Sequence, residues 1–248
     1  MAFDGRMRIY LTLSCNLRCP YCVNRAFEPV ALYNEVSASE WAAAINRIGR
    51  NVVLTGGEPF TYSELIPLVN AINTNMEVFI YTNLTQDPTE FIQHVGRPVR
   101  FLGSYHPCSG NPARVLAHAQ LLAAHKRFRG SVHAINWVGH NLDKARRELA
   151  KMKWTFKVDI DQQVKFKAMS CKKYRRRVHC VSSNMLIAPN GVRYPCVSAI
   201  MRDVLPQECI LTQPLRAPEV AVDCPDWGHC AACDGLTTRS LKFLDSSC

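Results

Sequence analysis

Strand-like and helix-like stretches alternate along most of this 248-residue chain. The clearest helix signal is a capping box of Ser37 and Glu40, followed by Trp41 and Ile45 on one face. Apolar periodicity predicts strands at 8–13, 51–55, 76–82, 99–104, 131–138 and 154–160, and helices at 38–48, 62–73, 88–95, 112–127 and 142–152. Six such units with right-handed crossovers predict an α/β fold, a partial (β/α)6 TIM-like barrel that stays open.

Length and composition set the expected organisation. With 48% hydrophobic residues, the chain can bury one substantial core and a small appended domain. We expect the partial barrel over 1–160, and a basic connector with a small C-terminal auxiliary-cluster domain over 161–248. The sequence has no apolar run of 18 residues and no charged-then-apolar leader, so a cytoplasmic protein without membrane contact is expected.

Three cysteines near the amino terminus have the spacing of metal ligands. Cys15, Cys19 and Cys22 form a C-x3-C-x2-C pattern directly after the first predicted strand. Three thiolates at this spacing can bind three irons of a cubic iron–sulfur cluster and leave a fourth iron open for chemistry. A structural zinc ion is the alternative, but it needs four ligands and no fourth cysteine or histidine lies nearby in sequence.

A glycine-rich turn follows the second predicted strand. Its residues are Gly56, Gly57, Glu58 and Pro59, after the apolar run VVLT. Glycines let the backbone approach a ligand closely, and a glutamate can pair with an ammonium group. Alone, this sequence would predict an ordinary turn, but it follows the cysteine triad by about three dozen residues.

Together these motifs resemble the radical S-adenosylmethionine (radical SAM) superfamily, whose triad carries an aromatic residue before the last cysteine, here Tyr21. The resemblance implies a [4Fe–4S] cluster on the triad, and binding of the amino group of SAM at the turn 56–59. It also implies contacts to SAM from the ends of the third to fifth strands, for which the candidates are Thr82, Asn83, Ser104 and Asn136. Each of these four could instead be an ordinary turn residue.

A second group of cysteines lies in the carboxyl-terminal third. It resembles the SPASM or shorter twitch extension, which implies one auxiliary [4Fe–4S] cluster on Cys180, Cys196, Cys230 and Cys233. Cys224 is the rival for one ligand position. A cluster closed by four thiolates would pass electrons or brace the fold. A four-cysteine zinc ribbon is the alternative that the spacing allows.

Positive charge is concentrated between residues 144 and 177, a segment that contains thirteen Lys and Arg residues and three acidic residues. This density predicts a polyanionic substrate, with nucleic acid or a nucleotide foremost. A solvated helix face, or cations that balance anionic clusters, would give the same pattern. The predicted substrate-binding residues are Lys172, Lys173, Arg175, Arg176 and Arg177. Tyr174, which could stack on a base, and His106, a possible proton acceptor, are the predicted catalytic residues.

The resemblance implies an enzyme that uses an electron from a reduced flavodoxin or ferredoxin-type donor to cleave SAM. The 5′-deoxyadenosyl radical so formed would abstract a substrate hydrogen, in an isomerase or oxidoreductase reaction on a nucleic-acid base or nucleotide. The alternatives are an alcohol dehydrogenase of the aminocyclitol type, a peptide-modifying enzyme, and a zinc-stapled nucleic-acid-binding module without catalysis.

Overall fold

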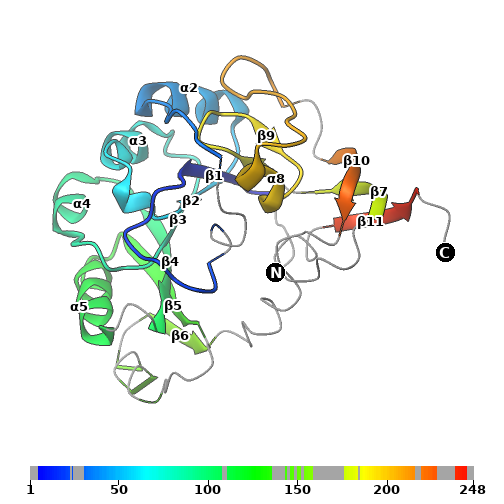
Figure 1. Ribbon diagram of the computed structural model, residues 1–248. Helices are drawn as coiled ribbons and strands as arrows, with labels where there is room; N and C mark the ends of the chain where they lie inside the picture. The colour runs from blue at the N-terminus through cyan, green and yellow to red at the C-terminus, as the bar shows by residue number, and fades with distance from the viewer. Residues whose placement is uncertain are drawn as a thin grey trace.

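The computed structural model describes most of the predicted barrel and parts of the carboxyl-terminal third (Figure 1). The described residues are 5–22, 24, 31–107, 111–135, 143, 146–147, 150–151, 154–158, 176–183, 185–215, 219–227 and 238–244. Asn136, Lys172, Lys173, Tyr174, Arg175, Cys230 and Cys233 lie outside them, as does the predicted boundary at 160/161. Most of the predicted helix 142–152 lies outside them too.

One eight-stranded sheet organises the molecule, with strand order β6-β5-β4-β3-β2-β1-β8-β9. Strands β1 to β6 are parallel to their neighbours, and β8 also runs parallel to β1. The strands are β1 (Met7–Thr12), β2 (Val52–Gly56), β3 (Val78–Thr82), β4 (Val99–Tyr105), β5 (Phe128–Ala134), β6 (Thr155–Val158), β8 (Leu186–Ile187) and β9 (Arg193–Tyr194). The expected open α/β sheet is confirmed.

Helices cover one face of this sheet. They are α2 (Ala38–Ile48), η1 (Pro59–Thr61), α3 (Leu65–Ala71), α4 (Thr89–His94) and α5 (Pro112–Ala123), with α8 (Val197–Arg202) near β8 and β9 (Figure 1). The predicted capping box of α2 is present, and the helix ends at Gly49 in the left-handed conformation. Trp41 and Ile45 of α2 are fully buried in the core between helices and sheet.

Several element boundaries differ from the sequence prediction by one to four residues, and the shifts at β5 and α5 are among the largest. Strand β5 starts at Phe128, three residues before the predicted start at 131, because Gly130 belongs to the strand and is not a break. A Cβ atom at Gly130 would lie 2.5 Å from the carbonyl oxygen of Phe101 on β4. Glycine at this position therefore permits a close approach of two strands. Helix α5 ends at Ala123, before the predicted end at 127.

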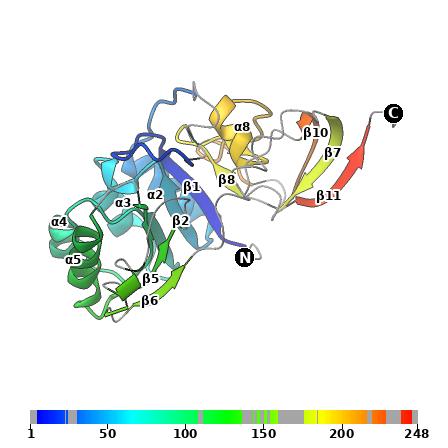
Figure 2. The ribbon, with the colours of Figure 1, turned by 60° about the horizontal axis from the view of Figure 1, so that its bottom comes forward.

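The carboxyl-terminal third contributes to two sheets. Strand β8 extends the main sheet beside β1, with Arg8 opposite Leu186. A separate antiparallel sheet contains β7 (Arg176–Ser182), β10 (Val220–Trp227) and β11 (Thr238–Phe243), in the order β10-β7-β11. Figures 1 and 2 both place this small sheet to one side of the main sheet, beyond α8.

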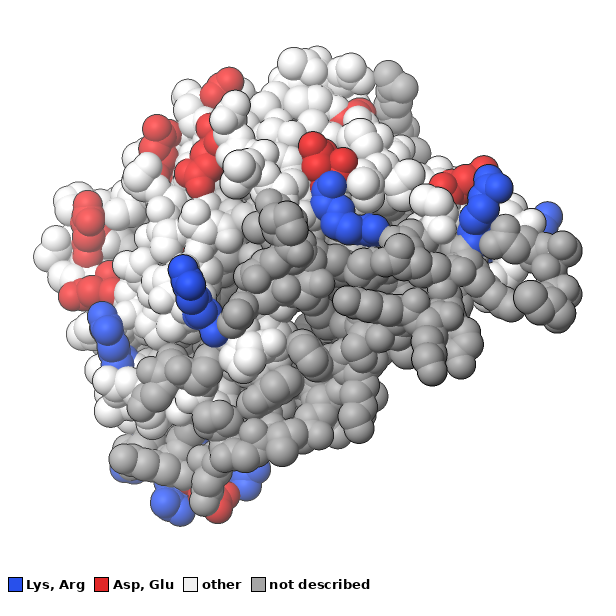
Figure 3. Space-filling view, viewed as in Figure 1, with Lys and Arg blue, Asp and Glu red and all other residues white. Residues whose placement is uncertain are grey.

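Exposed acidic side chains lie on the helical side of the molecule. Figure 3 shows acidic side chains over the outer helices α2 to α4, where Glu40, Glu64 and Glu90 are exposed.

Within the described residues, no helix has the length and apolar character needed to cross a membrane.

Candidate active site

The sequence motifs meet at the carboxyl ends of neighbouring parallel strands. The cysteine loop follows β1, the turn 56–59 follows β2, and Thr82 ends β3. His106 comes directly after β4. Since adjacent parallel strands end at the same edge of a sheet, four loops from four units are brought together here. This edge is where ligand sites form in folds of this kind.

The glycine turn and the cysteine loop are locked together by their backbones. The N–H of Gly57 donates to the carbonyl of Thr12 at 2.8 Å, and the N–H of Glu58 donates to the carbonyl of Ser14 at 2.9 Å. A Cβ atom at Gly56 would lie 2.1 Å from the oxygen of Thr12, and one at Gly57 would lie 2.0 Å from the oxygen of Ser14. Only glycine permits this approach, and Gly56 also has a φ of 145°.

Glu58 turns its carboxylate into the protein. The side chain is 1% exposed and accepts three hydrogen bonds. Its donors are the N–H of Asn83 at 2.7 Å, the hydroxyl of Thr82 at 2.8 Å and the N–H of Phe60 at 3.1 Å. Glu58 therefore ties the turn after β2 to the end of β3. Sequence reasoning assigned this carboxylate to a ligand ammonium and missed its structural contacts.

A chain of amide hydrogen bonds connects the end of β3 to the first cysteine. The side-chain amide of Asn83 donates to Oδ1 of Asn16 at 2.8 Å and lies 4.0 Å from the sulfur of Cys15. Asn16 in turn donates to the hydroxyl of Thr85 at 2.8 Å, and that hydroxyl donates back to Oδ1 of Asn83. This closed ring of three polar side chains holds the residue next to Cys15 in place.

Replacing Asn83 with leucine is expected to weaken iron retention by the cysteine loop about tenfold or more, because the hydrogen bonds that orient Asn16 are lost. Asn70→Leu is the control for losing an asparagine that ties two segments together, since Asn70 bridges the carbonyl of His94 and the N–H of Gly96 away from the cysteine loop. The measurement is iron per chain after reconstitution and graded chelation. Equal iron loss from both variants would contradict this positioning role.

The three cysteines of the triad lie on one loop, and none of them forms a disulfide. The N–H of Cys22 donates to the carbonyl of Cys19 at 3.1 Å, and the N–H of Leu17 points to the sulfur of Cys15 at 3.4 Å. Burial of the sulfur raises the pKa of Cys15, whereas the donors Leu17 N–H and Asn83 lower it. Within the described ranges, no three Cys, His, Asp or Glu side chains converge closely enough to hold a metal ion. The donor set fits an iron–sulfur cluster, and the thiols would close around it on binding.

The end of the cysteine loop packs across the other side of the site. Cys19 and Tyr21 form a small apolar cluster with Ile135, which follows β5. The hydroxyl of Tyr21 lies 3.1 Å from Nδ1 of His106, and the two rings stack with centroids 5.8 Å apart. Burial lowers the pKa of His106 to about 4, so the imidazole is neutral near pH 7. Its Nδ1 is already engaged by Tyr21.

Glu58 and His106 are expected to change stability with pH in opposite directions. Burial raises the pKa of Glu58 from 4.5 to about 7, so its contribution is present below pH 4.5 and is lost as pH rises to about 7. The pKa of His106 is lowered from 6.5 to about 4, so its contribution is present above pH 6.5 and is lost as pH falls to about 4. Each effect amounts to about 3 kcal/mol.

Replacing either Glu58 or His106 should therefore leave the pH dependence of stability that the other residue causes. In urea unfolding of the iron-free chain, Glu58→Gln should show a free energy of unfolding that falls from pH 6.5 to pH 4. His106→Gln should show one that falls as pH rises from 4.5 to 7. Parallel pH profiles for the two variants would contradict this assignment.

The remaining predicted site residues are spread over several elements. Ser104 is half-buried near the end of β4. Cys180 lies in β7 and Cys196 is the residue before α8, where its sulfur lies 3.2 Å from the hydroxyl of Ser198. Cys224 lies in β10, and Arg177 is exposed in β7. Arg176 begins β7.

Comparison with known proteins agrees with these motifs. Residues 9–101 match the family model of the Radical SAM superfamily. A GTP 3′,8-cyclase from Synechococcus sp. is 38% identical over 69 residues, which cover 27% of this chain and 20% of that protein. A PqqA peptide cyclase from Rhodopseudomonas palustris is 38% identical over 81 residues, 30% of this chain and 20% of that protein.

A 7-carboxy-7-deazaguanine synthase from Clostridium acetobutylicum is 29% identical over 100 residues, 38% of this chain and 45% of that protein. This chain thus spans less than half the length of these curated relatives. A solved structure, native anSMEcpe with bound AdoMet and Cp18Cys peptide, has a TM-score of 0.54 at 14% identity, over 84% of this chain and 77% of that one. This likeness shows the shared fold. The matched residues 9–101 contain both the cysteine loop and the turn 56–59, so the two motifs of the site lie within the region that is similar to the Radical SAM superfamily.

Proposed function

We propose that this chain is a radical SAM enzyme in which Cys15, Cys19 and Cys22 hold a [4Fe–4S] cluster that binds SAM. When bound, the cluster and SAM supply reductive cleavage of SAM and a radical that abstracts hydrogen from the substrate. The observation that carries this proposal is the backbone lock between the loop after β1 and the turn after β2. It brings both motifs of the superfamily to one edge of the sheet.

The chain's own residues have distinct tasks in this proposal. Glu58 fixes the end of β3, and Asn16 with Asn83 orients the cysteine loop. Thr82 donates to Glu58, so we assign it a supporting role. Ser104, half-buried at the same edge, stays a candidate for direct contact with SAM.

The second part of the site is an apolar wall. Tyr21 and the neutral ring of His106 stack against each other beside the triad. A wall of this kind excludes water from the reacting groups and can pack against a flat aromatic ligand. We assign His106 a packing role, because its low pKa makes it a weak proton acceptor at neutral pH.

For the substrate, we propose a nucleotide or a nucleic-acid base. Two supports are the formal net charge of +10 and the similarity of residues around the motifs to a GTP 3′,8-cyclase and a 7-carboxy-7-deazaguanine synthase. A peptide substrate is the second candidate, because a PqqA peptide cyclase matches over a similar length. The electron donor we propose is a reduced flavodoxin or ferredoxin.

The small antiparallel sheet belongs to the proposed auxiliary-cluster domain. We propose Cys180, Cys196, Cys230 and Cys233 as ligands of a second [4Fe–4S] cluster, with Cys224 as the rival for one position. Replacing Cys196 with alanine should lower iron by about four atoms per chain and leave the triad cluster in place. Zinc in place of iron would instead support a structural ribbon.

The proposed function is tested by the formation of 5′-deoxyadenosine from SAM under anaerobic reduction. Reconstituted protein is incubated with GTP, a mixed-sequence oligonucleotide or a mixed peptide library, each labelled with deuterium at carbon. The proposal expects 5′-deoxyadenosine in all reactions and deuterium transfer only from the nucleotide or oligonucleotide. Transfer from the peptides alone would support the second candidate, and no SAM cleavage in any reaction would contradict the proposal.

A further inference from the structure

A cavity of about 330 Å³ lies at the other end of the barrel strands, away from the cysteine loop. Its walls come from the segments that enter β3, β4 and β5, at residues 74–78, 97–100, 126–127 and 129. On β4, Arg100 lines this cavity, whereas Ser104 lies at the carboxyl end of the same strand. Four residues of extended strand separate the two by about 13 Å. The cavity is therefore distinct from the site of the cysteines.

The described lining of this cavity is strongly basic. It contains five cationic side chains and one carboxylate: Arg97, Arg100, Lys126, Arg127, Arg129 and Glu77. Glu77 pairs with Arg100 at 2.7 Å, and both side chains are about half exposed. Among the cavity-lining residues, positive charge thus exceeds negative charge by four. A concave surface with this excess concentrates anions.

Two of these arginines build the cavity. The guanidinium of Arg97 is buried and donates to the backbone carbonyls of Ile72 and Met76. That of Arg127 donates to the carbonyl of Ile92. Carbonyl oxygens fix these guanidinium groups without neutralising their charge. The positive potential of the cavity therefore comes in part from arginines that are held in place by the backbone.

The other cations are positioned to contact a ligand. Lys126, Arg100 and Arg129 are exposed. Arg100 and Arg129 stand opposite each other on β4 and β5, which places two like charges on the same face of adjacent strands. The guanidinium of Arg100 also lies 5.6 Å from the centre of the Phe79 ring, which restricts its conformations. Glu77 offsets the charge of Arg100 in part, and an anion that contacts both guanidinium groups would reduce the remaining repulsion between them.

We propose that this cavity binds the phosphate groups of a nucleotide polyphosphate or of a nucleic-acid backbone, with Arg100, Arg129 and Lys126 as the contacting residues. One arginine guanidinium can bind a phosphate group through two parallel hydrogen bonds. The cavity has room for at least one phosphate group with its hydration. This inference is independent of SAM cleavage, because the residues that carry it lie outside the cysteine site.

The test measures binding to the full, reconstituted chain by calorimetry, without reductant or SAM. One titrant is inorganic tripolyphosphate, and the other is a single-stranded RNA of 12 nucleotides. The test variant is Arg100→Gln/Arg129→Gln, with Lys126→Gln as a second, independent variant. Arg114→Gln is the matched control, because Arg114 is exposed on α5 and does not line the cavity.

We expect the native chain to bind at least one titrant and the double variant to bind it at least tenfold more weakly, while Arg114→Gln stays within twofold. Lys126→Gln should weaken binding in the same direction. With RNA, the plot of log affinity against log salt has a negative slope. This slope should become less steep by about 1.4 in the double variant, because two phosphate contacts are lost.

The two titrants identify the source of the phosphate groups. Tight tripolyphosphate with weak RNA binding assigns a free polyphosphate ligand, and the reverse assigns a nucleic-acid backbone. No binding of either titrant, or equal weakening in Arg114→Gln, would overturn the inference. Failure of SAM cleavage would leave this result unaffected, so the two proposals fail separately.

Discussion

Replacing Gly57 with alanine is expected to lower the free energy of unfolding by more than about 3 kcal/mol and to abolish retention of iron. The new Cβ atom would lie 2.0 Å from the backbone oxygen of Ser14, well inside van der Waals contact. No side-chain rotation can relieve this overlap, because both partners are backbone or Cβ atoms. The hydrogen bond from Gly57 to Thr12 would have to break.

Gly96→Ala is the matched control for this substitution. A Cβ atom at Gly96 would have no neighbour within 4 Å, so alanine there should leave stability the same or raise it by a few tenths of a kcal/mol. Urea unfolding and iron content of both variants check the prediction. Equal urea midpoints for Gly57→Ala and Gly96→Ala would show that the lock between the two motifs is not formed.

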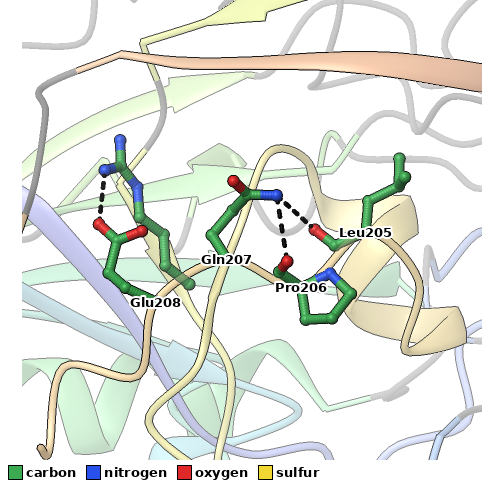
Figure 4. A network of polar contacts seen from close by, with 5 residues as sticks. Leu205, Pro206, Gln207 and Glu208 are labelled. Atoms are coloured by element: carbon green, nitrogen blue, oxygen red, sulfur yellow. Dashed lines mark hydrogen bonds and ion pairs between the residues drawn. The ribbon is translucent and has the colours of Figure 1, made fainter. Parts of the chain in front are cut away.

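The second large effect is expected at a buried ion pair in the carboxyl-terminal third. Arg193 on β9 and Glu208 are 1% and 7% exposed, and their charged groups lie 3.1 Å apart. Their backbones are also paired, since the N–H of Arg193 donates to the carbonyl of Glu208 and the N–H of Gln207 to the carbonyl of Arg193. Figure 4 shows Glu208 and Gln207 in this network, where the amide of Gln207 reaches the carbonyls of Leu205 and Pro206.

Glu208→Leu should cost about 3–5 kcal/mol, because it leaves the Arg193 charge buried without its carboxylate. Arg193→Met/Glu208→Leu should recover most of this loss, since both charges are then absent. Glu77→Gln, at the exposed pair with Arg100, should cost less than about 1 kcal/mol. A double-mutant cycle by urea unfolding gives these values. Additive losses in the double variant would contradict a coupled buried pair.

Local sequence signals predicted the barrel well. The capping box at Ser37 and Glu40, the order of strands and helices and the position of the two motifs at strand ends all depend on residues close in sequence. The two site motifs were also found from sequence, because the residues of each motif are close together in the chain: the triad spans 15–22 and the turn spans 56–59. Their adjacency follows from the rule for parallel strands.

Contacts between distant residues could not be predicted in this way. The inward orientation of Glu58 depends on Asn83, 25 residues away, and the ring from Asn16 to Thr85 spans 69 residues. The pairing of β8 with β1 joins segments more than 170 residues apart. The basic cavity was missed for the same reason, since its cations come from two segments, 97–100 and 126–129, that are far apart in sequence.

The most direct test of the central claim is iron content and 5′-deoxyadenosine formation in Cys15→Ala/Cys19→Ala/Cys22→Ala, reconstituted without oxygen and reduced with dithionite. Our account predicts that the triple variant loses about four irons per chain and all SAM cleavage, while Cys209→Ser, at a half-buried cysteine outside both proposed ligand sets, keeps both. Unchanged iron in the triple variant, or 5′-deoxyadenosine formed without the triad, would contradict it.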